Sequence, residues 1–145
     1  MSGELTFFDT NVLVYAFDTT EALKREKCKK LVFSVFRGET KGLVSNQVLA
    51  ELFFVLTKKV KHPYEAKKAA NLVKGFIGSG NWIKVNYSCA TAAKATGLAA
   101  DNKMHFWDAL IAGTMLENQA FEIITENGKD FSKIGQIKAV NPVKN

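Results

Sequence analysis

The 145-residue sequence has no hydrophobic run long enough to cross a membrane, and it holds only two cysteines, two histidines and two prolines. A membrane-spanning helix needs about 20 consecutive, mainly apolar residues. The N-terminal residues 1–4 also lack the basic stretch and apolar segment of a secretory signal. We therefore expect a soluble, cytoplasmic protein with no membrane anchor.

The scarcity of cysteine and histidine argues against zinc chemistry. Cys28 and Cys89 are far apart in the sequence, and His62 and His105 have no partner at zinc-ligand spacing. We expect both cysteines to be buried, reduced thiols. The chain also lacks a glycine-rich phosphate-binding loop and a Ser or Cys nucleophile with an evident base. These absences exclude the commonest nucleotide-binding and covalent-catalysis motifs.

Acidic residues are fewer than basic ones, with 14 Asp and Glu against 20 Lys and Arg, which gives a net charge of +6. Such an excess favours a polyanionic partner, although a solvated lysine-rich surface explains it equally well. The hydrophobic content of 47% and the length of 145 residues suit one domain with a real core. Because no linker-like segment divides the chain, we expect a single domain over residues 1–145.

Short apolar segments alternate with helical patterns along the whole chain. We predict strands at 5–8, 42–45, 82–85, 122–125 and 137–140, and helices at 12–17, 21–36, 46–60, 64–77, 88–100 and 106–118. Asn11 is the expected N-cap of the first helix. Strands joined by helices form right-handed crossovers and a parallel sheet that is covered on both faces. The predicted fold class is therefore α/β, and side chains that follow the strands should meet at one edge of the sheet.

Asp9 and Glu51 are acids in largely apolar surroundings. Asp9 follows the first predicted strand, where an acid also commonly caps the next helix. Glu51 has mostly apolar neighbours along its helix, and a lone buried carboxylate costs on the order of several kcal/mol. Either Glu51 serves a metal or catalytic site, or it lies at the edge of the apolar stripe and pairs with Lys58 or Lys59.

Asp108 and the segment after Thr125 add further oxygen atoms. Asp108 would lie in the first turn of a helix, where the helix dipole alone also favours an acid. Glu126, Asn127 and Asp130 either supply an oxygen ligand or form a turn. Clustered carboxylates without cysteine or histidine suit Mg²⁺ or Mn²⁺. Such ions activate water for attack on phosphorus, so these residues predict a metal site for phosphate chemistry.

Four motifs resemble those of the PIN-domain nuclease family, especially the toxin ribonucleases of VapBC toxin–antitoxin modules. They are Phe8-Asp9-Thr10-Asn11, Ser45-Asn46-Gln47-Val48-Leu49-Ala50-Glu51-Leu52, Trp107-Asp108-Ala109-Leu110-Ile111-Ala112 and Ile124-Thr125-Glu126-Asn127-Gly128-Lys129-Asp130-Phe131. The resemblance covers nearly the whole chain. It implies a three-layer α/β/α sandwich with a mainly parallel sheet of about five strands, cleavage of RNA with Mg²⁺ or Mn²⁺, homodimers, and inhibition by an antitoxin.

Carried over by position, the resemblance implies that Asp9, Glu51 and Asp108 are the core acids. Asp9 and Asp108 are then the best candidates for direct metal ligands, and Glu51 completes the catalytic and metal-binding set. In the fourth motif many relatives have an Asp two residues after the Thr, where this chain has Asn127. Asp130 is our expected fourth catalytic and metal-binding residue, with Glu126, or Asn127 through its neutral amide oxygen, as alternatives. Supporting hydrogen bonds are expected from Asn11, Ser45, Thr125 and Asn127.

Two functions follow from this resemblance. The first is a metal-dependent endoribonuclease, most simply the toxin of a toxin–antitoxin pair, although a role in RNA maturation is compatible with the same residues. The second is a PIN-type module that binds RNA or protein with weak or no catalysis, because Asn127 replaces an acid. The chain also has eleven phenylalanines. Phe33, Phe36, Phe53 and Phe54 either contribute to a dimer or antitoxin surface or pack their two helices together.

Overall fold

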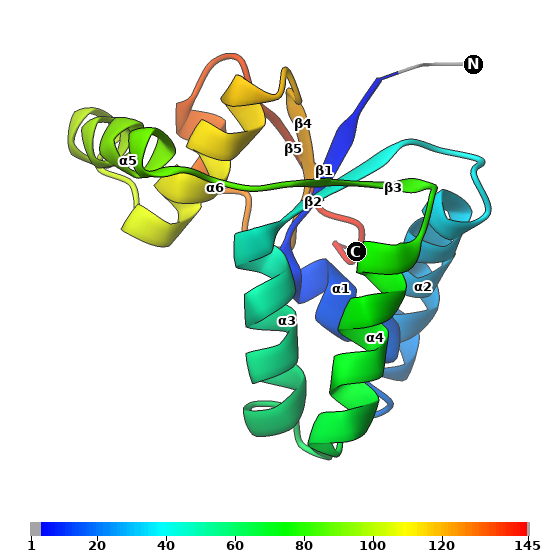
Figure 1. Ribbon diagram of the computed structural model, residues 1–145. Helices are drawn as coiled ribbons and strands as arrows, with labels where there is room; N and C mark the ends of the chain where they lie inside the picture. Colours follow the sequence, from blue (N-terminus) through cyan, green and yellow to red (C-terminus); the bar gives the residue numbers. More distant parts are fainter. Residues whose placement is uncertain (1–3, 145) are drawn as a thin grey trace.

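A five-stranded parallel sheet forms the centre of the computed structural model, which describes residues 4–144 (Figure 1). The strand order is β3-β2-β1-β4-β5, and each neighbouring pair is parallel. The strands are β1 (Thr6–Phe8), β2 (Gly42–Ser45), β3 (Trp82–Val85), β4 (Glu122–Ile124) and β5 (Lys138–Val140). The predicted α/β class and parallel sheet of about five strands are confirmed.

Helices cover both faces of this sheet. Figure 1 shows α1 to α4 grouped on one side, while α5 and α6 lie on the other, which confirms the three-layer arrangement. The helices are α1 (Thr10–Phe17), α2 (Ala22–Phe36), α3 (Asn46–Lys58), α4 (Ala66–Gly78), α5 (Cys89–Asn102) and α6 (Phe106–Glu117), and a short 3₁₀ helix, η1, spans Phe131–Lys133. The sequence pattern located each α-helix to within two residues at either end and did not indicate η1.

The beginning of α1 differs from the prediction. Asp9, not Asn11, is the N-cap, and its Oδ1 accepts a hydrogen bond of 2.7 Å from the Thr10 N–H. The strand and the helix are therefore separated by a single residue. Asn11 is inside the first turn, which frees its amide for the interactions described below.

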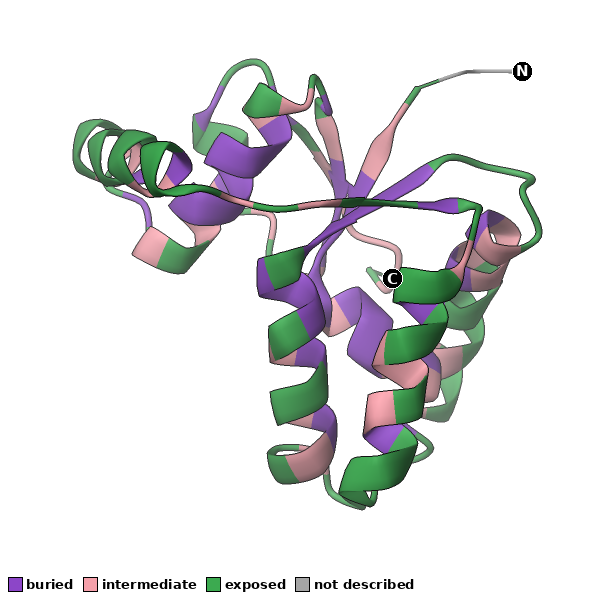
Figure 2. Ribbon diagram, in the orientation of Figure 1, coloured by how far each residue is buried: buried purple, intermediate pink, exposed green. Residues whose placement is uncertain are grey.

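The core is made by the central strands and by aromatic rings from the helices. Phe7, Leu43 and Ile123 have no exposed surface, and burying such a side chain fully is worth about 1.5–3 kcal/mol. Trp82 packs at ring-centroid distances of 4.9 to 5.7 Å against Phe8, Phe36 and Phe76. Figure 2 shows that buried segments face the sheet, whereas α5 is mostly exposed.

The phenylalanines singled out in the sequence divide into two groups. Phe33 and Phe36 pack in the aromatic cluster, with their ring centroids 5.5 Å apart. Phe53 and Phe54 on α3 remain 38% and 53% exposed. The α3 pair is therefore the more exposed of the two.

The two cysteines are both free, but only one fits the prediction. Cys28 is buried, and burial raises the pKa of its thiol to about 11. Cys89 is exposed at the beginning of α5, so the expectation of two buried thiols is wrong for this residue. Within residues 4–144, every helix is too short or too polar to span a bilayer.

The strand register brings the functional segments together. Phe8 at the end of β1 pairs with Ile124 at the end of β4, and the Asp9 N–H donates to the Ile124 carbonyl at 3.1 Å. Asp9 and Thr125 therefore leave the sheet side by side. β2, the neighbour of β1 on its other side, runs directly into α3, which carries Glu51.

Candidate active site

Asp9 is held by hydrogen bonds from two elements at the end of β1. Its Oδ1 accepts from the Thr10 N–H at 2.7 Å, and its Oδ2 accepts from the Thr125 hydroxyl at 2.8 Å. The residue is 7% exposed. Burial raises the pKa of the carboxyl group, although the hydrogen bonds from Thr125 and Thr10 act in the opposite direction. Asp9 is thus both the helix cap and a buried acid with a poorly stabilised charge.

Thr125 and Asn11 link Asp9 to the loop after β4. The Asn11 amide donates to Thr125 Oγ1 at 3.4 Å and to Asp9 Oδ2 at 3.5 Å. Asn11 Oδ1 accepts from the Glu126 N–H at 3.2 Å, and Thr125 Oγ1 accepts from the Asn127 N–H at 3.0 Å. Asn11 and Thr125 therefore hydrogen-bond to Asp9, and their role in supporting a site stays a prediction.

Glu51 reaches the same region from the side of α3. Its Oε1 accepts a hydrogen bond of 3.0 Å from the Thr10 hydroxyl. Burial raises the pKa of Glu51, and the charge of Asp9 raises it further, whereas the Thr10 hydrogen bond lowers it. Within the described part of the chain Glu51 forms no ion pair with Lys58 or Lys59, so that alternative is wrong.

Asp108 lies in the first turn of α6. Burial raises its pKa from 3.8 to about 6, and the charges of Asp9 and Asp130 contribute in the same direction. A helix dipole acting alone would lower the pKa of an acid at this position. Burial and the charges of Asp9 and Asp130 therefore outweigh any stabilisation of the Asp108 charge by the helix dipole.

Asp130 makes its contacts around the beginning of α6. Its Oδ2 accepts from the His105 N–H at 3.0 Å, and its Oδ1 lies 2.9 Å from Lys133 Nζ. These two contacts keep the pKa of Asp130 below its ordinary value. Asp130 thus lies near Asp108 but already has a cationic partner.

Glu126 has partners on α1 and α2. Its carboxylate accepts from the Tyr15 hydroxyl at 2.6 Å and from Lys24 Nζ at 3.0 Å. Burial acts to raise the pKa of Glu126, but these two hydrogen bonds outweigh it and the pKa is lowered. This set of contacts, which the sequence did not indicate, fastens the loop after β4 to the helices.

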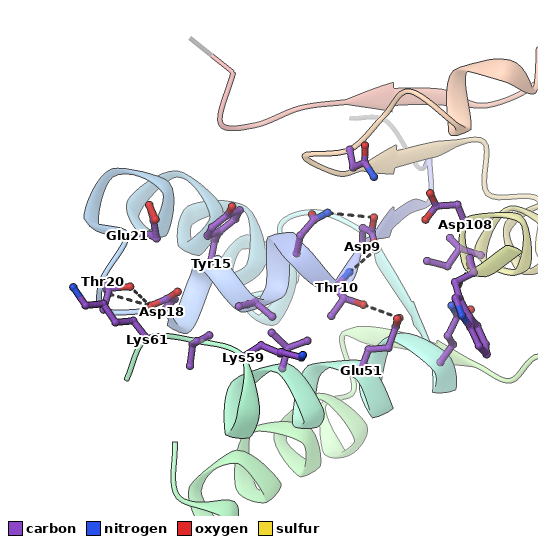
Figure 3. A pocket seen from close by; sticks show the side chains of 18 residues that line it. Asp9, Thr10, Tyr15, Asp18, Thr20, Glu21, Glu51, Lys59, Lys61 and Asp108 are labelled. Atoms are coloured by element: carbon purple, nitrogen blue, oxygen red, sulfur yellow. Dashed lines mark hydrogen bonds between the residues drawn. The ribbon is translucent and has the colours of Figure 1, made fainter. Parts of the chain in front are cut away.

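A pocket with a volume of about 730 Å³ joins the acids. Figure 3 shows Asp9, Glu51 and Asp108 at one end and Asp18, Thr20 and Lys61 at the other. The pocket is lined by Asp9, Thr10, Asn11, Val14, Tyr15, Asp18, Thr20, Glu21, Gln47, Glu51, Val55, Lys59, Val60, Lys61, Trp107, Asp108, Ile111 and Asn127. Of the three candidates for the fourth position, Asn127 is the one that lines it.

Ser45 lies immediately before α3. Its buried hydroxyl accepts from the Val48 N–H at 3.3 Å and so caps the helix that carries Glu51. Two other contributors were not indicated by the sequence. Thr10 bonds to both Asp9 and Glu51, and Gln47 donates from Nε2 to the Trp107 carbonyl at 3.2 Å. In the sequence, the polar Gln47 beside the apolar stripe of α3 could have indicated that its side chain makes a specific contact.

The donor set suits a hard divalent cation by its chemistry. Asp9, Glu51 and Asp108 offer only carboxylate oxygens, and the charge of Asp9 raises the pKa of both others. A bound cation would replace this repulsion with attraction. Among residues 4–144, however, no three His, Cys, Asp or Glu side chains already surround one point. The three acids therefore line one pocket and are suitable ligands for such an ion, but their side chains are not already arranged around a single metal position.

Comparisons with known proteins agree with the fold. The family model described as "PIN domain" matches residues 6–137. No curated protein sequence matches the chain. A solved toxin–antitoxin complex from Klebsiella pneumoniae is similar, with a TM-score of 0.65 and 22% identity over 97% of this chain and 99% of the other. VapC20 of Mycobacterium tuberculosis, described as a sarcin–ricin loop cleaving toxin, gives a TM-score of 0.69 and 16% identity over 88% and 93%.

Proposed function

The chain belongs to the PIN domain family, and from this premise we propose that it is a Mg²⁺- or Mn²⁺-dependent endoribonuclease, the toxin of a toxin–antitoxin pair. One observation carries the proposal: Asp9, Glu51 and Asp108 line one pocket although they come from three separate segments of the chain. The pKa values of all three acids are raised, chiefly by burial, which supports a site where their charges are under-stabilised. Acids kept in that state are typical of functional sites.

Each acid has a proposed role. Asp9 and Asp108 would hold the metal ion directly, and Glu51 would complete the site. Such an ion, when bound, lowers the pKa of a coordinated water and stabilises charge on the phosphate oxygens. Thr10 and Thr125 fix the Asp9 carboxylate by hydrogen bonds of 2.7 and 2.8 Å, so that its oxygens need little reorganisation.

The fourth position remains divided between two residues. Asn127 lines the pocket and offers a neutral amide oxygen. Asp130 carries the charge but is paired with Lys133 at 2.9 Å. We propose that Asn127 faces the ligand while Asp130 acts on Asp108, and that Asp130 joins the metal site only if it leaves Lys133.

A second candidate function has one observation in its favour. An acid position is filled by the neutral Asn127, and the described acids form no ready cage for an ion. The alternative is therefore a PIN-type module that binds RNA or protein with weak or no catalysis. It predicts RNA binding without metal-dependent cleavage.

Cleavage of a mixed pool of structured and single-stranded RNA separates the two functions. Wild type should cleave with Mg²⁺ or Mn²⁺ and not with EDTA, and Asp9→Asn and Asp108→Asn should abolish cleavage. Asp101→Asn is the matched control, because Asp101 is an exposed acid on α5. Folded wild type that cleaves no RNA with either metal would favour the binding module.

The proposed partners are an antitoxin protein and a second copy of the chain. Phe53 and Phe54 on α3 expose 38% and 53% of their surface, and exposed aromatic residues are enriched at protein interfaces. Light scattering should give a dimer for wild type and a monomer for Phe53→Ser combined with Phe54→Ser. A monomeric wild type would contradict the dimer.

A further inference from the structure

Trp107 places a half-exposed indole in the pocket that contains the acids. It immediately precedes Asp108, lines the pocket with Asp9 and Glu51, and is 52% exposed. The only other tryptophan, Trp82, is 2% exposed in the core. Leaving apolar surface in water forgoes about 25 cal/mol for each Å² that could be buried. A large aromatic side chain left open beside a reactive site suggests a ligand that covers it.

The position of Trp107 is fixed from two sides. Its ring meets Phe106 in a T-shaped contact, with a centroid distance of 5.2 Å and an interplanar angle of 72°. Its backbone carbonyl accepts a hydrogen bond of 3.2 Å from Gln47, whose side chain is in the pocket wall and 6% exposed overall. A single T-shaped neighbour cannot cover both faces of an indole. The residue is therefore a prearranged flat surface that requires little ordering when a ligand binds.

The charges around the pocket restrict what that ligand is. The pocket is lined by two exposed cations, Lys59 and Lys61, and by five acids, Asp9, Asp18, Glu21, Glu51 and Asp108, in a chain whose net charge is +6. A phosphate chain would therefore bind here together with the divalent cation of the proposed function, which offsets the acids. Flat aromatic surfaces combined with cations are typical of proteins that bind single-stranded nucleic acid, because every unpaired base has a face that can stack. In a duplex, both faces of an internal base are already stacked on its neighbours.

We propose that Trp107 stacks on an unpaired base of the bound RNA and so positions the strand beside Asp9, Glu51 and Asp108. This inference rests on the proposed function and adds to it a positioning residue. The competing ligand is a cationic side chain of a protein partner, which would lie over the same indole through a cation–π contact.

The presence of one exposed and one buried tryptophan makes the stacking directly observable. Experiments use the Asp9→Asn background with Mg²⁺ present, so that the RNA stays intact. A single-stranded oligoribonucleotide should quench the fluorescence of Trp107, and the same strand annealed to its complement should not. The quenching should vanish in Trp107→Phe, which retains only the buried Trp82.

Affinity for a labelled RNA then measures what the indole contributes. Trp107→Ala should bind single-stranded RNA about 5- to 150-fold more weakly, which corresponds to about 1–3 kcal/mol for one stacked base. Trp107→Phe should stay within about threefold of its parent because Phe still stacks. Phe121→Ala is the matched control, since Phe121 is a 45% exposed aromatic residue outside this pocket. Trp82 fluorescence reports whether Trp107→Ala is folded. If this variant is unfolded, fluorescence quenching in the Asp9→Asn protein and its loss in Trp107→Phe decide whether Trp107 stacks on RNA.

Several results would overturn the inference. They are RNA binding without quenching, equal quenching by duplex RNA, unchanged affinity in Trp107→Ala, or no RNA binding together with quenching by a lysine- and arginine-rich peptide. The proposed function is judged separately by cleavage. If wild type and Trp107→Ala cleave single-stranded RNA equally well, the function stands and the stacking is wrong. If RNA quenches Trp107 but wild type cleaves nothing, the nuclease is wrong and the stacking stands.

Discussion

Replacing Asp108 with Asn should make the metal-free protein more stable at neutral pH. The side chains have nearly the same shape, but Asn carries no charge beside Asp9 and Asp130. In the folded protein the pKa of Asp108 is raised from 3.8 to about 6, first by burial and then by those two acids. The folded state therefore binds the Asp108 proton more tightly than the unfolded state does, and ionisation of Asp108 destabilises the fold.

The size of the effect follows from the shift. At about 1.4 kcal/mol per pKa unit, moving from 3.8 to about 6 removes about 3 kcal/mol of stability once the pH exceeds both values. Stability should fall as the pH rises from about 4 to about 6 and then level off. Asp108→Asn avoids this loss, so at pH 7.5 its free energy of unfolding should exceed that of wild type by up to about 3 kcal/mol. For a domain of this size, that gain corresponds to a rise in Tm of about 6–12 °C.

Thermal and urea unfolding in EDTA, between pH 3.5 and 8, would measure the difference. The two proteins should converge near pH 3.5, where Asp108 is protonated in both states. The exposed Asp101→Asn should follow wild type throughout. If Asp108→Asn is no more stable than wild type at pH 7.5, Asp108 is not an under-stabilised acid and the electrostatic account of the site is wrong.

Three further predictions concern other parts of the molecule. Thr125→Val removes the 2.8 Å hydrogen bond to Asp9, and should lower stability by about 1.5–3 kcal/mol and metal-dependent cleavage at least tenfold, as measured by urea unfolding and initial rates. Asn127→Asp adds a charge to the pocket lining and should tighten Mn²⁺ binding, which calorimetry would detect; weaker binding would contradict its proposed place. Gly42→Ala brings a methyl group to within 2.8 Å of Val35 and Trp82, and should cost about 1–3 kcal/mol in urea unfolding.

Much of the fold could be predicted because strand and helix periodicity are local properties. The beginning of α1 could not be placed to the residue, because a single Asp9 serves as both the strand exit and the helix cap. The contact of Glu51 with Thr10 spans two distant segments, so the sequence left open whether Glu51 pairs with a lysine instead. The packing of α1 against α3 decides that question.

The segment after Thr125 shows where local reasoning stops. Glu126, Asn127 and Asp130 are close in sequence and were equivalent as oxygen donors. In the structure they face different partners: Lys24 and Tyr15 for Glu126, the pocket for Asn127, and Lys133 with His105 for Asp130. These partners come from α1, α2, η1 and the beginning of α6, so only the tertiary fold separates the three residues.

The dependence of RNA cleavage on Mn²⁺ concentration would test whether Asp9, Glu51 and Asp108 carry a catalytic metal ion. Single-turnover rates would be measured for wild type, Asp9→Asn and the exposed-acid control Asp101→Asn, each confirmed as folded. A metal-carrying site at Asp9, Glu51 and Asp108 predicts rates that rise with Mn²⁺ and saturate for wild type and the control, with no cleavage by Asp9→Asn. Cleavage that is independent of Mn²⁺, or equal in Asp9→Asn and wild type, would contradict it.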